Sequence, residues 1–542
     1  MNFTIDRRLL LKGALALPAM MTVSSTLRAA ETGGFTHDVA SGDPGHEEVT
    51  LWTRYIGPDA TGSRLRVEVA SDVGFTRMVA RGEATASAES DHCAHARATG
   101  LTPGHWYYYR FVAPDGGTSP IGRTRTLPRT GVERFRIGVM SCANATSGWF
   151  TAYAHAAQRQ DLDLIVHLGD YIYESPLDRS DAVAGLAERR GIGPSHEAVA
   201  LADYRLRYAT YRDDPDLRLL HRLYPMIVMR DDHETANNSW RDGAANHDPG
   251  EGDWDVRAAA AIRAHEEWMP MRRKNYDAYQ IGNLATLFRI ETRNLARTKQ
   301  LDIETALAGA SDMKAAVAEF LTGPLQDPSR TMMGKAQEDW LTQGMRASVG
   351  SGTKWQLLAQ QVIMAPTRLP RIDESWFAAG TVLDPSEQAR LKIAVALADA
   401  GLPMSLDRWD GYPAARRRLL NGAADANANL VVLSGDSHNA WAYDLETGGR
   451  PVGVEFAGQG VSSFGLDKRF HGDPAVIARD FVTANPNLKW CDTSRRGYMV
   501  LDVNKEAVTN EWVFLPTDSP GASQPLETFS LSSEAGAHRL TA

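Results

Sequence analysis

Cysteine is scarce in this chain, which excludes a fold that depends on disulfide bonds. Only three cysteines, Cys93, Cys142 and Cys491, occur among the 542 residues. Disulfide-stabilised domains need several paired cysteines within a short sequence. An odd number also leaves at least one thiol without a disulfide partner. Cys142 is the one whose sequence surroundings indicate another use.

The chain also lacks an excess of basic residues and, after its N-terminal segment, any long apolar run. No later stretch is apolar for long enough to cross a bilayer, so we expect a soluble mature protein. The net charge of −9 argues against a large nucleic-acid-binding surface. It leaves room for a local basic pocket that binds phosphate. The length predicts two or three structural units.

The N-terminal segment has the features of a signal peptide. Arg7 and Arg8 lie in the sequence Asp-Arg-Arg-Leu-Leu-Leu-Lys, which precedes an apolar run over residues 13–23 and the small pair at 29–30. The paired arginines resemble a twin-arginine signal, and an ordinary secretory signal is the alternative. We therefore expect residues 1–30 to be a signal peptide read by the twin-arginine export machinery, and the protein to be periplasmic or secreted.

The pattern of the remaining chain changes near residue 130. Short aromatic and β-branched runs punctuated by Gly and Pro predict an N-terminal β-sandwich domain over residues 31–130. Strands that alternate with helices predict an α/β catalytic domain over residues 131–520. The last segment, residues 521–542, is rich in Ser, Gly and Ala, and we expect it to be a mobile tail.

Two common catalytic motifs are absent. There is no G-x-S-x-G sequence, which argues against an α/β-hydrolase type of Ser-His-Asp triad. Gly334 and Lys335 are followed by Ala336, so this segment is not a phosphate-binding P-loop.

Instead, several predicted strands run directly into polar residues at their carboxyl ends. A single aspartate after a strand is usually a helix cap or a turn residue. The inference of a site therefore depends on several strands that end in the same way. Ligands of α/β sheets gather outside the carboxyl ends of the strands, so these residues could converge. A thiol, carboxylates, a phenol, an amide and imidazoles together favour a metal site; they are Cys142, Asp170, Tyr173, Asp231, Asp232, His233, Asn238, Asp436 and His438.

These motifs resemble those of the alkaline phosphatase D family, the PhoD-type phosphatases and phosphodiesterases among the calcineurin-like metallophosphoesterases. The resemblance covers nearly the whole mature chain. It is carried by Ser141-Cys142, Gly169-Asp170-Tyr171-Ile172-Tyr173-Glu174, Asp231-Asp232-His233-Glu234, Asn237-Asn238 and Ser434-Gly435-Asp436-Ser437-His438-Asn439-Ala440-Trp441.

The resemblance implies a calcineurin-like β-sandwich core flanked by helices, an α/β fold, beside a fibronectin-like N-terminal sandwich. It implies Fe³⁺ held by the Cys142 thiolate, the Tyr173 phenolate, Asp170 and a group from Asp436 or His438. It also implies Ca²⁺ held by Asp170, as a bridge, with Asp232 and Asn238. Thiolate and phenolate suit ferric iron, and carboxylate and amide oxygens suit calcium.

The implied reaction is hydrolysis of small-molecule phosphate monoesters or diesters by a metal-bound hydroxide. In that reaction Asp170 holds both metals, and His233 stabilises the transition state or protonates the leaving group. The segment that contains Arg293 departs from the family pattern Leu-Asp-Thr-Arg-x-Tyr-Arg, which leaves the substrate contacts open.

Three alternatives stay open at this stage: a phospholipase-D-like diesterase, a non-catalytic secreted binding protein on the same fold, and a zinc or manganese enzyme. The intact set of ligand types argues against the binding protein. The pairing of Cys142 with Tyr173 favours iron.

Overall fold

The computed structural model describes residues 34–58, 62–178, 182–378, 380–521 and 523–541. The expected signal peptide, residues 1–30, lies outside the described residues. No helix in the described part of the chain is long and apolar enough to cross a membrane.

The first of two large sheets has nine strands, and four neighbours in its middle are parallel. Three of these four, β8, β9 and β10, are the predicted strands that end at Cys142, before Asp170 and before Asp231. In spatial order the strands are β20 (Glu527–Glu534), β19 (Ala507–Leu515), β18 (Arg496–Asn504), β8 (Arg134–Met140), β9 (Leu164–His167), β10 (Pro225–Val228), β1 (Phe35–Gly42), β2 (Glu48–Tyr55) and β5 (Cys93–Thr99).

The second large sheet has seven strands and a parallel centre formed by β12, β13, β14 and β16. One of these, β14, is the predicted strand that ends before Asp436. The spatial order is β11 (Asp277–Ile281), β12 (Ala285–Arg289), β13 (Trp355–Ala359), β14 (Leu430–Ser434), β16 (Arg450–Ala457), β15 (Ala440–Thr447) and β17 (Leu488–Asp492).

The two large sheets pack face to face around one continuous apolar core. Ile137 and Val166 from the first sheet share this core with Leu357, Val431 and Phe456 from the second, and all five are buried. Strands that are buried on both faces consist of nearly continuous apolar residues, as the central strands here do. This β-sandwich with helices outside confirms the predicted fold class.

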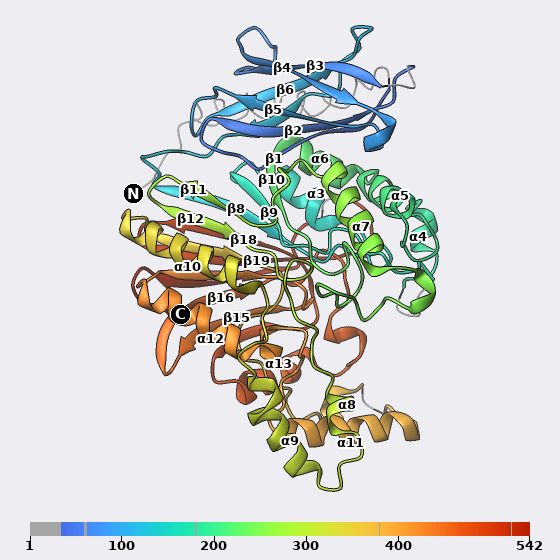
Figure 1. Cartoon of the computed structure of the whole chain (residues 1–542), viewed down its shortest axis with the longest axis vertical. Helices are drawn as coiled ribbons and strands as arrows, with labels where there is room; N and C mark the ends of the chain where they lie inside the picture. The colour runs from blue at the N-terminus through green and yellow to red at the C-terminus, as the bar shows by residue number, and fades with distance from the viewer. Residues whose placement is uncertain (1–33, 59–61, 179–181, 379, 522, 542) are drawn as a thin grey trace, which may run out of the picture.

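Helices cover the outer face of each large sheet (Figure 1). The first sheet is covered by α3 (Thr151–Gln158), α5 (Leu201–Arg212), α6 (Pro215–Leu223) and α7 (Trp254–Trp268), with the short α4 (Leu186–Arg189) beside them. The second is covered by α10 (Gly334–Gly350), α12 (Pro413–Asp425) and α13 (Pro474–Ala484).

The N-terminal region is a smaller β-sandwich, as predicted. Its outer layer is a four-stranded sheet with the order β4 (Met78–Ala86), β3 (Ser63–Ala70), β6 (Trp106–Val112) and β7 (Gly122–Arg125). Its inner layer is β1, β2 and β5, and β1 pairs in parallel with β10. The nine-stranded sheet therefore runs without a break from the N-terminal sandwich into the larger one.

Three helices form a projection at the lower end of the molecule in Figure 1: α8 (Ile303–Leu307), α9 (Met313–Thr322) and α11 (Pro385–Asp399). A small apolar cluster that includes Phe320 and Leu406 holds the projection together.

The C-terminal segment corrects one expectation. Residues 521–542 are expected to be a mobile tail, but Glu527–Glu534 forms β20 and pairs with β19. Phe529 stacks on Trp490 with ring centroids 4.2 Å apart. Phe529 and Leu531 alternate with polar residues and give this strand one apolar side. The prediction of a mobile tail was wrong because it relied on the high Ser, Gly and Ala content and did not consider this alternation.

Candidate metal centre

The predicted site residues gather at one edge of the sandwich, where the carboxyl ends of the parallel strands of both sheets meet. Cys142 follows β8, Asp170 follows β9, and Asp231 and Asp232 follow β10. Asp436, the fifth, follows β14 of the second sheet. Side chains separated by hundreds of residues thus meet because two sheets present the same end to one edge.

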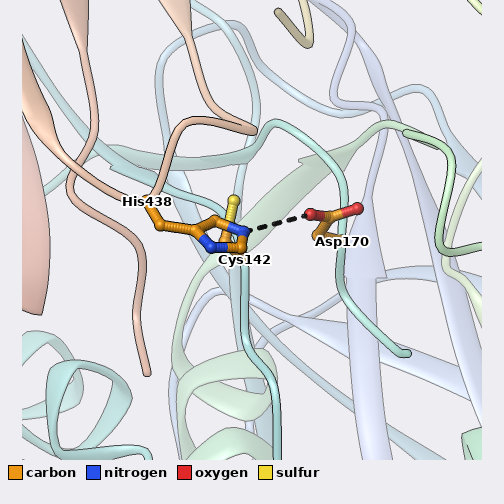
Figure 2. A group of neighbouring side chains, drawn as sticks. All are labelled: Cys142, Asp170 and His438. Atoms are coloured by element: carbon orange, nitrogen blue, oxygen red, sulfur yellow. Dashed lines mark ion pairs between the residues drawn. The ribbon is translucent and has the colours of Figure 1, made fainter. Parts of the chain in front are cut away.

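Cys142, Asp170 and His438 form a group whose ligand atoms lie within 4.8 Å of one another (Figure 2). The His438 Nε2 atom lies 3.9 Å from Asp170 Oδ2. The Tyr173 hydroxyl donates to Asp170 Oδ2 at 3.0 Å and lies 3.1 Å from His438 Nε2. Sulfur, phenol, carboxylate and imidazole therefore surround one point, the set predicted for iron.

The orientation of His438 suits metal binding. Its Nδ1 atom lies 2.7 Å from the carbonyl oxygen of Phe464, so Nδ1 carries the hydrogen and Nε2 presents its lone pair to Asp170. Burial, above all, lowers the pKa of His438 to about 4. A neutral imidazole is the form that binds a metal ion.

Asp170, Asp232 and His233 form a second group with ligand atoms within 4.8 Å, and Asp170 belongs to both groups. The backbone N–H of Asn238 donates to Asp232 Oδ2 at 2.6 Å, so Asn238 lies beside this group. Asp170 is the residue that the two groups share, which is the position that the predicted bridging role requires.

His233 is held by a buried carboxylate that is close to its ring. His233 Nδ1 lies 2.6 Å from Glu174 Oε2, and its ring lies 4.1 Å from the Tyr173 ring, centroid to centroid. Burial by itself would lower the pKa of His233, but Glu174, Asp232 and Asp170 outweigh burial and raise it well above its ordinary value. The imidazolium form is therefore favoured.

A third acidic group, Asp231, Asp232 and Asp436, surrounds the guanidinium group of Arg293. Arg293 Nε donates to Asp231 Oδ1 at 2.5 Å, and Nη2 donates to Asp436 Oδ1 at 3.2 Å. Nη1 donates to Asp407 Oδ2 at 2.6 Å. Arg293 is fully buried.

Sequence reasoning did not assign Arg293 or Asp407 to the site. Arg293 follows β12 of the second sheet in the same way that Asp436 follows β14. The strand-end pattern could therefore have found Arg293, had the strand over 285–289 been recognised. Asp407 follows no strand, and only the fold brings it to the site.

Five of the predicted site residues have left-handed backbone conformations. The φ angles are 57° at Cys142, 54° at Asp170, 52° at Asn238, 60° at Asp436 and 57° at His438. Positive φ is uncommon outside glycine and concentrates at functional sites. The surrounding structure thus holds these residues in conformations that their own preferences disfavour.

Close packing of the two central loops requires a glycine before Asp170. Gly169 has φ of 111°, and a Cβ atom there would lie 2.6 Å from the backbone nitrogen of Asp231. Glu234 fastens the same loops, since its carboxylate accepts hydrogen bonds from the backbone nitrogens of Asp170 and Asp231 at 3.0 and 2.6 Å. Burial, above all, raises the pKa of Glu234 to about 7.

The buried acids of the centre are poorly balanced by the protein itself. Burial raises the pKa of Asp170, Cys142 and Tyr173 well above their ordinary values, and for the thiol and the phenol Asp170 adds to the effect. A cation bound among them would reverse this effect and stabilise their anionic forms.

Buried carboxylate oxygens without hydrogen-bond partners show whether the residues present could bind a metal ion. Among the described residues, Asp170 Oδ1, Asp231 Oδ2 and Asp232 Oδ1 are buried without a hydrogen-bond partner. A buried polar atom without a partner is costly, and carboxylate oxygens without partners are what metal ions bind. The residues present therefore fit a metal centre.

Comparison with known proteins gives one consistent result. The family model of the PhoD-like phosphatase matches residues 137–512, and that of the PhoD-like phosphatase N-terminal domain matches residues 22–128. The chain is 31% identical to alkaline phosphatase D of Bacillus subtilis (strain 168) over 564 aligned positions, which cover 96% of this chain and 86% of that protein.

A solved structure of PhoD superposes on this chain with a TM-score of 0.74 and 29% identity, covering 94% of this chain and 92% of that one. Sequence and structure thus agree over almost the whole length. This chain belongs to the family of PhoD-like phosphatases.

Proposed function

We propose that this phosphatase is an exported, metal-dependent phosphoesterase that hydrolyses phosphate monoesters, phosphate diesters or both. The observation that carries the metal dependence is a pair of buried carboxylate oxygens without hydrogen-bond partners in the first two ligand groups, Asp170 Oδ1 and Asp232 Oδ1. The family membership supports the phosphatase activity.

Fe³⁺ would be held by Cys142, Tyr173, Asp170 and His438 or Asp436, and Ca²⁺ by Asp170, Asp232 and Asn238. Thiolate and phenolate donors favour ferric iron, and the oxygen donors of the second group favour calcium. Bound there, the ions would activate water and neutralise the charge of the phosphoryl group.

His233 is the proposed acid of the reaction. Glu174 fixes the ring through Nδ1, which leaves Nε2–H to donate a hydrogen bond. That donor can stabilise charge on the phosphoryl group or pass its proton to the oxygen of the leaving alcohol.

The proposed location is the periplasm or the exterior of the cell, because of the twin-arginine pattern at Arg7 and Arg8. Fractionation of cells that produce the R7K/R8K double variant tests this proposal. Retention of the variant in the cytoplasm supports it, and unchanged export contradicts it.

The decisive experiment measures hydrolysis of p-nitrophenyl phosphate and bis-p-nitrophenyl phosphate, with and without calcium and a chelator, beside elemental analysis for iron. Calcium-dependent turnover by an iron-containing protein is the expected result. Full turnover after removal of all metal would contradict the proposal. The ratio of the two rates ranks monoesters against diesters.

A further inference from the structure

Arg408 is a buried cation beside the metal centre that has not been given a role above. In the sequence it follows Asp407, which binds Arg293, and precedes Trp409. Only 6% of its surface is exposed. Its Nε atom lies 3.9 Å from Asp436 Oδ2. Its guanidinium group is therefore adjacent to a residue of the proposed iron site.

The hydrogen bonds of Arg408 are few for a buried arginine. In the described part of the chain, its guanidinium group donates to Met404 Sδ at 3.7 Å, and a thioether is a weak acceptor. Its contact with Asp436 is longer than a hydrogen bond, and Arg293 already donates to the other oxygen of Asp436.

Neighbouring arginines show how a buried guanidinium group is normally satisfied. Arg297 donates to Asp407 and to the hydroxyl of Tyr412. Arg416 donates to Asp410 at 2.6 Å and to the carbonyl oxygen of Met364. In the described part of the chain Arg408 has no carboxylate within hydrogen-bond distance, so part of its donor capacity is open to an anion.

We propose that Arg408 binds phosphoryl oxygens of the substrate and thereby favours phosphate monoesters over diesters. This inference rests on the proposed function. A monoester carries two negative charges at alkaline pH and a diester carries one. A guanidinium group can bind two oxygens of either ester, but its positive charge is attracted more strongly to the doubly charged terminal phosphate.

The specificity test compares wild-type enzyme with R408Q and R408K. We expect R408Q to lower kcat/KM for p-nitrophenyl phosphate roughly 10- to 100-fold, chiefly through KM, as for the loss of a hydrogen bond to a charged group. For bis-p-nitrophenyl phosphate we expect a loss of less than roughly threefold. R408K keeps the charge without the two-pronged geometry, so its monoester loss should lie between these values.

Arg417 is the matched control, because it is an exposed arginine on α12 that donates to Gln326 at 3.0 Å. R417Q should leave both substrates unaffected. Equal losses on the two substrates in R408Q, or no loss on either, would overturn the proposal. If R408Q gives no cooperative thermal unfolding, R408K carries the same comparison.

Binding of inorganic phosphate, measured by calorimetry on the metal-loaded protein, separates this proposal from the proposed function. We expect phosphate affinity to fall roughly tenfold or more in R408Q, whether or not either ester is hydrolysed. Wild-type protein that hydrolyses neither ester but binds phosphate through Arg408 would contradict the proposed function alone. Unchanged phosphate affinity in R408Q would contradict the role of Arg408.

Discussion

At the scale of single residues, Asp170 is the side chain on which the proposed centre depends most. It belongs to both ligand groups, accepts a hydrogen bond from Tyr173 and has one buried oxygen without a partner. Replacement by asparagine keeps the shape but removes the anionic oxygen that two cations would share. The negative charge of this side chain therefore determines whether the proposed site can hold its metal ions.

We expect D170N to lose bound metal and to lower kcat at least roughly 1,000-fold, as metals contribute several kcal/mol of charge stabilisation. Elemental analysis and ester hydrolysis measure the two effects, and circular dichroism checks the fold. D518N, at an exposed aspartate, is the control. Full activity in D170N would show that the proposed metal assignment is wrong.

A second prediction concerns His233 and the leaving group. H233Q removes the proposed acid, so the rate should fall roughly 100- to 10,000-fold for an alkyl phosphate, whose alcohol needs a proton. The loss should be smaller for p-nitrophenyl phosphate, since p-nitrophenolate leaves without one. H196Q changes an exposed histidine and should alter neither rate. Equal losses for both leaving groups would argue for charge stabilisation alone.

The sequence alone predicted the site residues that directly follow strands. It did not predict the charged residues that contact them from distant segments. Cys142, Asp170 and Asp436 could be predicted because apolar strands precede them and because the motifs resemble a family. The contact of Arg293 with Asp231 and Asp407 joins distant segments, and no local spacing encodes it. The role proposed for Arg408 likewise rests on contacts between distant segments, such as its contact with Asp436.

At the scale of elements, His37 shows how β1 is joined to the helical layer. Its Nε2 atom lies 3.2 Å from the carbonyl oxygen of Ala209 in α5, and its ring meets the edge of Trp268 at 4.9 Å. Burial, followed by Arg54 and Arg212, lowers the pKa of His37 to about 3. The folded protein therefore holds His37 neutral.

This arrangement makes stability depend on pH with a definite sign. Below about pH 6.5 the unfolded chain protonates His37 and the folded chain does not, so its contribution to stability is complete above that pH and is lost as pH falls towards 3. At pH 5 the loss should be about 2 kcal/mol. Urea unfolding from pH 7 to 4 should show a shallower dependence in H37Q. Identical slopes for H37Q and wild type would contradict the assignment.

The elements differ in how far they could be predicted. The apolar runs at β8, β9, β10 and β14 are long enough to be recognised as buried strands. Residues 295–302 precede α8 and lie outside any helix. There Arg297 and its neighbours pack against the site instead. Contacts with the site overrode local helix propensity.

At the scale of the whole molecule, the boundary proposed near residue 130 does not separate two independent bodies. β1 pairs with β10, the Trp52 indole donates to the carbonyl oxygen of Glu267, and Arg212 stacks on Trp52 at 4.2 Å. A chain that begins at residue 131 would leave the edge of β10 and this apolar surface exposed.

We expect the 131–542 chain to aggregate or to unfold well below the temperature of the 31–542 chain. Thermal unfolding followed by light scattering compares the two. A truncated chain that is soluble, equally stable and active would show that the N-terminal sandwich is dispensable.

The convergence of both sheets on one edge also orders the events of biosynthesis. Cys142, Asp170 and Asp232 are made long before Asp436 and His438, which follow a strand of the other sheet. A nascent chain therefore has an incomplete set of the proposed metal ligands until its second sheet has packed against the first. If the proposed metals bind, their tight retention would show that the two halves have joined correctly, and the metal content would report on folding as well as on activity.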